Sequence, residues 1–78
     1  MNESERESLM KLHRACTEAL SRYLKEGEEM CRILSAIKNH PVTQQERTAI
    51  IAQRVKENEA QRAYDSVRQA LFSLAGWP

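Results

Sequence analysis

The sequence contains one strong break between two long segments of helix-forming residues. Pro41 cannot continue a helix, and it disfavours helical geometry at His40 before it. Residues of high helix propensity dominate both sides of this break, and the 78 residues include only two glycines and two prolines. So few turn-forming residues argue against a fold of short strands. The sequence therefore predicts an all-α fold, with a single domain over residues 1–78 because the chain is short.

Capping signals mark where the two helices begin and end. The segments Ser4 to Glu7 and Thr43 to Glu46 both have the spacing of a capping box. In this motif two side chains satisfy N–H groups that lack partners at a helix N-terminus. Near the end of the chain, Gly76 has the position of a glycine that terminates a helix. These signals predict two helix starts and one helix end.

We therefore expect helices over about residues 4–38 and 43–75, joined by a turn at 39–42. At 1.5 Å per residue each helix would be roughly 50 Å long, which predicts a long antiparallel hairpin. Gly27 lies inside the first helix, where glycine costs about 1 kcal/mol relative to alanine. The alternative is a three-helix bundle with a break near Gly27. Because its charged neighbours include no good capping residue, we favour a continuous helix.

The apolar residues of both helices are too widely spread for two helices to cover. On the first helix three rows spaced by seven residues form a broad face: Leu9, Cys16, Tyr23, Met30 and Ile37; Leu12, Ala19, Glu26 and Ile33; and His13, Leu20, Gly27 and Leu34. A chain of this size also buries only roughly 60% of its unfolded surface. The sequence thus predicts a homodimer in which two hairpins form a four-helix bundle. The expected interface residues are Leu24, Ile51, Val55, Phe72 and Trp77.

One charged residue interrupts the apolar face of the first helix. If the chain folds back at the predicted turn, residue i lies opposite about residue 80 − i, as in antiparallel bundles. Glu26 then lies opposite Arg54. Because burial of an isolated carboxylate is costly, we expect these two side chains to form a polar pair within the seam.

Metal-binding and catalytic motifs are nearly absent. His13 and Cys16 lie one helical turn apart, but structural zinc needs four ligands, and Cys31 and His40 are distant in the predicted hairpin. Two isolated glycines cannot supply a phosphate-binding loop, and neither histidine has an obvious nucleophile and orienting acid. We expect no metal, no cofactor and no enzymatic activity.

The charge pattern argues against anionic partners. The net charge is +1 and is evenly spread, so no long-range field attracts nucleic acid or a membrane surface. No apolar run approaches the roughly 20 residues of a membrane span, which makes the cytoplasm the expected location. The sequence best fits a small, non-catalytic, self-associating protein–protein interaction module, acting as an adaptor, a chaperone-like binder or a regulatory subunit. The alternative is a nucleic-acid-binding bundle that uses the row Arg47, Arg54 and Arg68.

Overall fold

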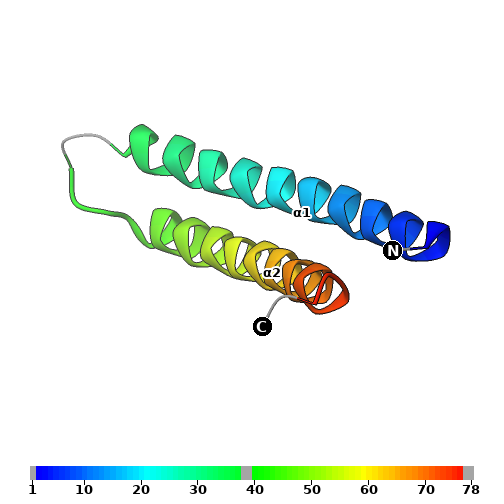
Figure 1. Ribbon diagram of the computed structural model, residues 1–78. Helices are drawn as coiled ribbons and strands as arrows, with labels where there is room; N and C mark the ends of the chain where they lie inside the picture. The colour runs from blue at the N-terminus through cyan, green and yellow to red at the C-terminus, as the bar shows by residue number, and fades with distance from the viewer. Residues whose placement is uncertain (1, 38–39, 77–78) are drawn as a thin grey trace.

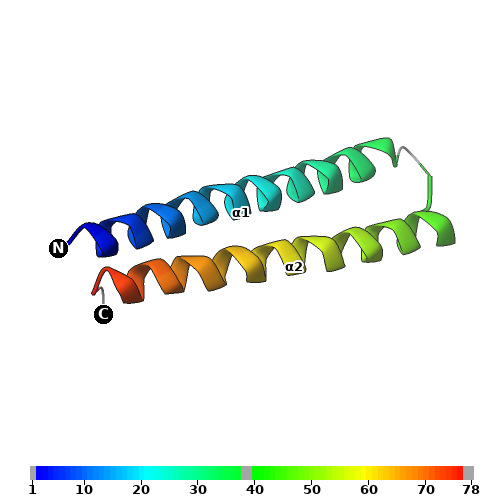
Figure 2. The same ribbon diagram turned by 90° about the vertical axis from the view of Figure 1, so that its right-hand side faces the viewer.

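The computed structural model describes residues 2–37 and 40–76, and it confirms the predicted all-α fold. Helix α1 spans Glu3–Ala36 and helix α2 spans Gln44–Leu74. The two helices run antiparallel and lie side by side over their whole length, as both views show (Figures 1 and 2). The molecule is a long rod with extents of 60 × 17 × 16 Å.

Helix α1 continues without a break through Gly27, as expected. The alternative three-helix bundle is therefore wrong. A Cβ atom added at Gly27 would meet nothing within 4 Å, so close packing within the hairpin does not require glycine there. The helix ends at Ala36, with Ile37 as its C-cap, and the expected end at Lys38 lies outside the described residues.

The start of α1 differs from the prediction. Asn2, rather than Ser4, is the N-cap, and its Oδ1 accepts a hydrogen bond of 2.8 Å from the Glu5 backbone N–H. Asparagine is among the best N-cap residues, and its use adds residues to the first turn. At the other end of the chain Gly76 adopts φ = 79° directly after the C-cap Ala75, which confirms its predicted role in helix termination.

The start of α2 is the predicted capping box. The Thr43 hydroxyl accepts a hydrogen bond from the Glu46 backbone N–H at 3.1 Å, and the Glu46 carboxylate accepts one from the Thr43 N–H at 2.9 Å. The backbone hydrogen bond from Thr43 lowers the pKa of Glu46 below its ordinary value. A lowered carboxyl pKa contributes stability above the ordinary pKa, and this contribution is lost as the pH falls through the lowered value.

Substitution of Thr43 by alanine tests this capping box. Thr43→Ala removes the acceptor for the Glu46 N–H, and loss of an N-cap side chain costs about 1 kcal/mol. We expect the free energy of unfolding to fall by that amount in urea titrations at fixed protein concentration. Thr48→Ala, which removes another exposed threonine of the same helix, is the matched control. Equal losses in both variants would contradict a capping role for Thr43.

The two helices meet along one line, which we call the hairpin seam. On α1 the seam residues recur at spacings of three and four: Leu9, Leu12, Cys16, Ala19, Tyr23, Glu26, Met30 and Ile33. On α2 the corresponding row, all buried or half-buried, is Glu46, Ile50, Gln53, Glu57, Ala60, Tyr64, Val67 and Leu71. This spacing is the heptad pattern of antiparallel helix pairs. The seam confirms the predicted apolar row of α1 that contains Leu9 and Cys16.

Candidate interaction surface

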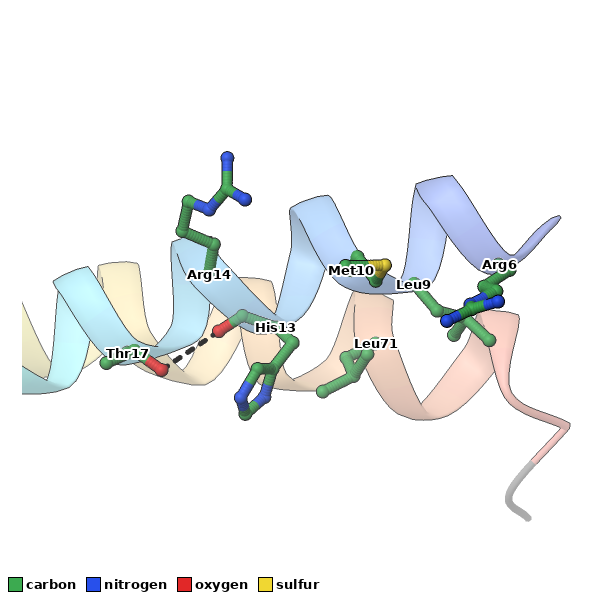
Figure 3. Close-up of a pocket in the computed structure, with 7 residues that line it drawn as sticks. All are labelled: Arg6, Leu9, Met10, His13, Arg14, Thr17 and Leu71. Carbon is green, nitrogen blue, oxygen red and sulfur yellow. Dashed lines mark hydrogen bonds between the residues drawn. The ribbon is translucent and has the colours of Figure 1, made fainter. Parts of the chain in front are cut away.

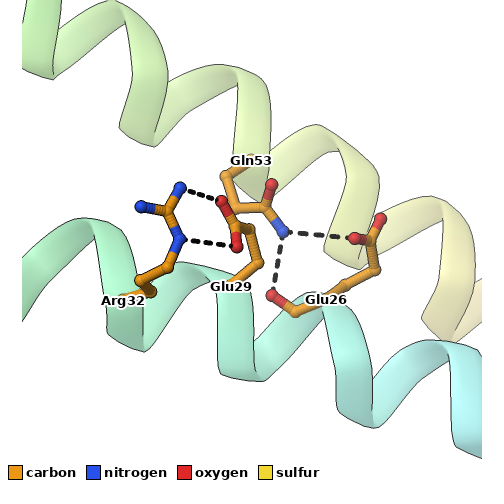
Figure 4. A network of polar contacts seen from close by, with 4 residues as sticks. All are labelled: Glu26, Glu29, Arg32 and Gln53. Atoms are coloured by element: carbon orange, nitrogen blue, oxygen red, sulfur yellow. Dashed lines mark hydrogen bonds and ion pairs between the residues drawn. The ribbon is translucent and has the colours of Figure 1, made fainter.

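The middle of the hairpin seam is polar. The side-chain amide of Gln53 donates to the backbone carbonyl oxygen of Glu26 at 2.8 Å and lies 3.5 Å from its carboxylate (Figure 4). Glu57 is buried one turn further along α2. Its Oε2 accepts a hydrogen bond from Arg54 at 3.0 Å, whereas its Oε1 is buried and has no hydrogen-bond partner within the described chain. Polar residues in a helical seam commonly fix the register of the two helices.

The expected polar pair of Glu26 and Arg54 is replaced by different partners. Gln53, rather than Arg54, lies against Glu26, so the register differs by one residue from the predicted one. Arg54 instead points along its own helix to Glu57. A shift by one residue moves a side chain about 100° around a helix, which takes Arg54 out of the seam.

A second ion pair flanks this polar layer on α1. Arg32 donates two hydrogen bonds to the Glu29 carboxylate, one of them from Nε at 2.9 Å (Figure 4). The hydrogen bond from Arg32 lowers the pKa of Glu29 below its ordinary value. Arg32 therefore pairs with Glu29, three residues before it, and not with Glu28, four residues before it.

A second row of uncharged residues follows the outside of α1 next to the hairpin seam. We call it the α1 stripe; its members, again spaced by three and four, are Met10, His13, Thr17, Leu20, Leu24, Gly27, Cys31 and Leu34. All except the half-buried Gly27 are exposed. The polar Thr17 is internally satisfied, since its hydroxyl donates to the His13 carbonyl oxygen at 3.1 Å. No carboxylate, lysine or arginine interrupts the stripe over 25 positions of a helix otherwise rich in charge.

Three shallow hollows lie along the α1 stripe from Met10 to Cys31. The first is lined by Met10, His13 and Thr17 of the stripe together with Leu71 of α2 (Figure 3). The second hollow is lined by Leu20, among other residues, and the third by Leu24, Gly27 and Cys31. These hollows lie where α1 and α2 leave a groove beside the seam. The groove and the stripe together form one continuous, mainly apolar surface.

The four described residues that were predicted as an interface lie on different parts of the surface. Leu24 belongs to the α1 stripe, and Phe72 lines the hollow that contains Leu20. Ile51 lies directly after the seam residue Ile50 near the start of α2, and 66% of its surface is exposed. Val55 lies on the outside of α2, with 50% of its surface exposed. The remaining residue of the prediction, Trp77, lies outside the described residues.

Of the arginine row of α2, Arg68 lines the second hollow. Arg54 is paired with Glu57, and Arg68 lies over the Tyr64 ring at 5.6 Å from its centroid, with Asp65 at 3.7 Å. Two of the three guanidinium groups are thus engaged within α2. This geometry provides little support for a row that tracks phosphates, which requires cations directed at solvent.

Metal-binding geometry is absent from the part of the chain that the structure describes. No group of three or more histidine, cysteine, aspartate or glutamate side chains there could hold a metal ion. Cys16 is buried in the seam and His13 is exposed, and both line the second hollow without a third or fourth ligand from the described residues beside them. Within residues 2–37 and 40–76, no helix contains an apolar stretch of the length that a membrane span needs.

Three members of the α1 stripe were not recognised in the sequence as part of a surface. Met10, Thr17 and Cys31 each lie one position after a seam residue, and the prediction combined the seam and the stripe into one broad face. The signal that separates them is a second heptad pattern shifted by one residue. Each residue along a helix points about 100° further around the axis, so the row shifted by one residue forms a second face of the helix.

Comparisons with known proteins found no matching family model, no curated protein and no solved structure with significant similarity to this chain. A function therefore has to follow from the residues and the geometry described above.

Proposed function

We propose that this chain is a small, non-catalytic helical interaction module that self-associates, with two hairpins forming a dimeric bundle in the cytoplasm. The observation that carries the proposal is the very small core of the single hairpin. Among the described residues only Cys16 and Ala60 are buried hydrophobic residues, and no large side chain is fully buried. A domain with so little buried apolar surface needs additional stabilisation, and association with another chain is one common source.

The exposed surface of the hairpin supports the same proposal. The chain exposes 6277 Å². A compact monomer of 9.0 kDa would expose about 4,900 Å², so the hairpin exceeds this by roughly 1,400 Å². A standard protein–protein interface covers about 800 Å² on each partner. The excess is therefore large enough for a stable dimer.

The chemistry of the exposed residues also favours a protein partner. Large apolar side chains at the surface include Met10, Leu24 and Phe72, each of which lines one of the three hollows. Contiguous apolar surface of this kind marks interaction sites with proteins. The two free thiols, Cys16 and Cys31, are consistent with a reducing compartment.

The mass in solution tests this proposal. We expect light scattering during size-exclusion chromatography to give twice the 9.0 kDa mass of one chain, falling toward the monomer mass on dilution. The helical circular dichroism signal should decrease on the same dilution, because the single hairpin has little core of its own. A folded chain of monomer mass at all concentrations would contradict self-association.

A further inference from the structure

We propose that the dimer forms with the α1 stripe of one copy packed antiparallel against the same stripe of a second copy. This inference rests on the proposed self-association and adds the surface, the helix orientation and the register. The occupant of the stripe is thus a second copy of this chain, rather than a different protein.

The direction of the α1 stripe fits a second helix neighbour. The stripe is the hairpin seam shifted by one residue, so its centre lies about 100° from the seam around the helix. In a bundle of four helices each helix contacts two neighbours at roughly a right angle. Helix α1 therefore presents one apolar row to α2 and a second, separate row to another helix.

The composition of α2 indicates which helix of the partner, α1 or α2, packs against the α1 stripe. On the same side of the hairpin, the row of α2 beside the seam contains the charged residues Arg47, Arg54, Asp65 and Arg68. If α2 were packed against the uncharged α1 stripe, these charges would lose water without gaining partners, which is costly. The stripe of a second α1 brings no charged residue, and it matches the first in length and polarity.

Two-fold symmetry then determines the register. The midpoint of the stripe lies between Leu20 and Leu24, so an antiparallel pair sets residue i opposite about residue 44 − i of its partner. Every stripe position is then matched with another stripe position. The resulting pairs are Met10 with Leu34 of the partner subunit, His13 with Cys31 of the partner subunit, Thr17 with Gly27 of the partner subunit, and Leu20 with Leu24 of the partner subunit.

The charges beside the stripe are complementary in this register. Arg14 and Glu28 lie in the row that borders the stripe, with Ser21 midway between them. Neither Arg14 nor Glu28 forms an ion pair among the described residues, and Arg14 points away from α2 (Figure 3). In the antiparallel dimer the partner's Glu28 lies two residues, or roughly 3 Å, from the position opposite Arg14, within reach of a long side chain, and symmetry repeats the pair. Such flanking pairs set the orientation of coiled helices.

Disulfide formation in the full-length chain tests the register. His13→Cys places a thiol opposite the partner's Cys31. We therefore expect mild oxidation to give a covalent dimer, with a disulfide between the introduced thiol and Cys31 of the partner subunit that peptide mass spectrometry identifies. The link cannot form within one chain, because 18 residues of helix separate these positions by roughly 27 Å. Lys11→Cys, an exposed position of α1 outside the stripe, is the matched control and should give much less covalent dimer.

The outcomes separate this inference from the proposed function. The wild-type chain should stay non-covalent on oxidation, because each Cys31 lies roughly 27 Å from the partner's Cys31 in this register. A Cys31–Cys31 dimer in the wild type, or equal crosslinking of His13→Cys and Lys11→Cys, would overturn the register while self-association stands. A monomer mass for the wild-type chain would overturn both.

Discussion

Leu24→Glu is expected to raise the dissociation constant of the dimer by about a hundredfold or more. In the proposed dimer Leu24 packs against Leu20 of the partner subunit, and symmetry places two such contacts at the centre of the interface. A carboxylate buried there without a partner costs several kcal/mol, and about 2.8 kcal/mol already corresponds to a hundredfold change. Sedimentation equilibrium of the wild-type and Leu24→Glu proteins over a concentration series measures the difference between their dissociation constants.

Val55→Glu is the matched control for Leu24→Glu. Both residues are exposed apolar side chains of long helices, with 58% of Leu24 and 50% of Val55 accessible in the single hairpin. Val55 lies on the outside of α2, away from both the seam and the stripe. We expect Val55→Glu to leave the dissociation constant within about twofold of wild type, as for typical surface substitutions. If both variants weaken the dimer equally, the α1 stripe is not its interface.

Glu57→Leu is expected to stabilise the protein. Glu57 is buried in the seam, its Oε1 has no hydrogen-bond partner within the described chain, and its only ion-pair partner there is Arg54. Because 60% of the Arg54 side chain is exposed, water can solvate the guanidinium once the carboxylate is gone. Replacing a poorly satisfied buried charge by an apolar residue of similar size often stabilises a protein by about 1–4 kcal/mol.

Thermal and urea unfolding at one fixed protein concentration measure the effect of Glu57→Leu. We expect a gain of about 2 kcal/mol, which corresponds to roughly 10 °C in the unfolding midpoint for a domain of this size. Glu59→Leu replaces an exposed glutamate two residues further along α2, and we expect it to change stability by less than about 0.5 kcal/mol. A loss of stability in Glu57→Leu would show that the Glu57 carboxylate is well solvated or well paired in solution.

Helix positions were predictable because their signals are local. Pro41 ends one helical region, and the capping box of Thr43 and Glu46 starts the next, so both depend on residues a few positions apart. The same reasoning predicted the continuity of α1 through Gly27. At the N-terminus of α1 two capping residues competed, and the asparagine at position 2 was used instead of Ser4.

The contacts between the helices were less predictable, because they depend on register. A difference of one residue in the register between the helices places Gln53 instead of Arg54 against Glu26. It changes the partner of Glu26 and the charge at the centre of the seam. Gln53 and Glu57 occupy seam positions although they are polar, so the apolar pattern of α2 is interrupted where the seam continues. Apolar periodicity alone cannot identify a seam position that holds a polar residue.

The α1 stripe required the structure for a similar reason. Two heptad rows shifted by one residue appear in a sequence as one wide apolar face. Once α2 covers the row that contains Cys16 and Tyr23, the row that contains Met10 and Leu24 remains exposed. The position of α2 therefore separates a surface already covered within the hairpin from one that is open to a second copy.

Nuclear Overhauser contacts between isotope-labelled and unlabelled chains test self-association through the α1 stripe most directly. In a mixed dimer we predict a contact between the Met10 methyl group of one chain and the Leu34 methyl groups of the other. Within one chain these two residues are 24 positions apart on α1, or roughly 36 Å, so the contact can arise only between copies. Contacts from the Met10 methyl group to the partner's Met10, or to residues of the partner's α2 without any to Leu34 of the partner subunit, would contradict the antiparallel α1 dimer.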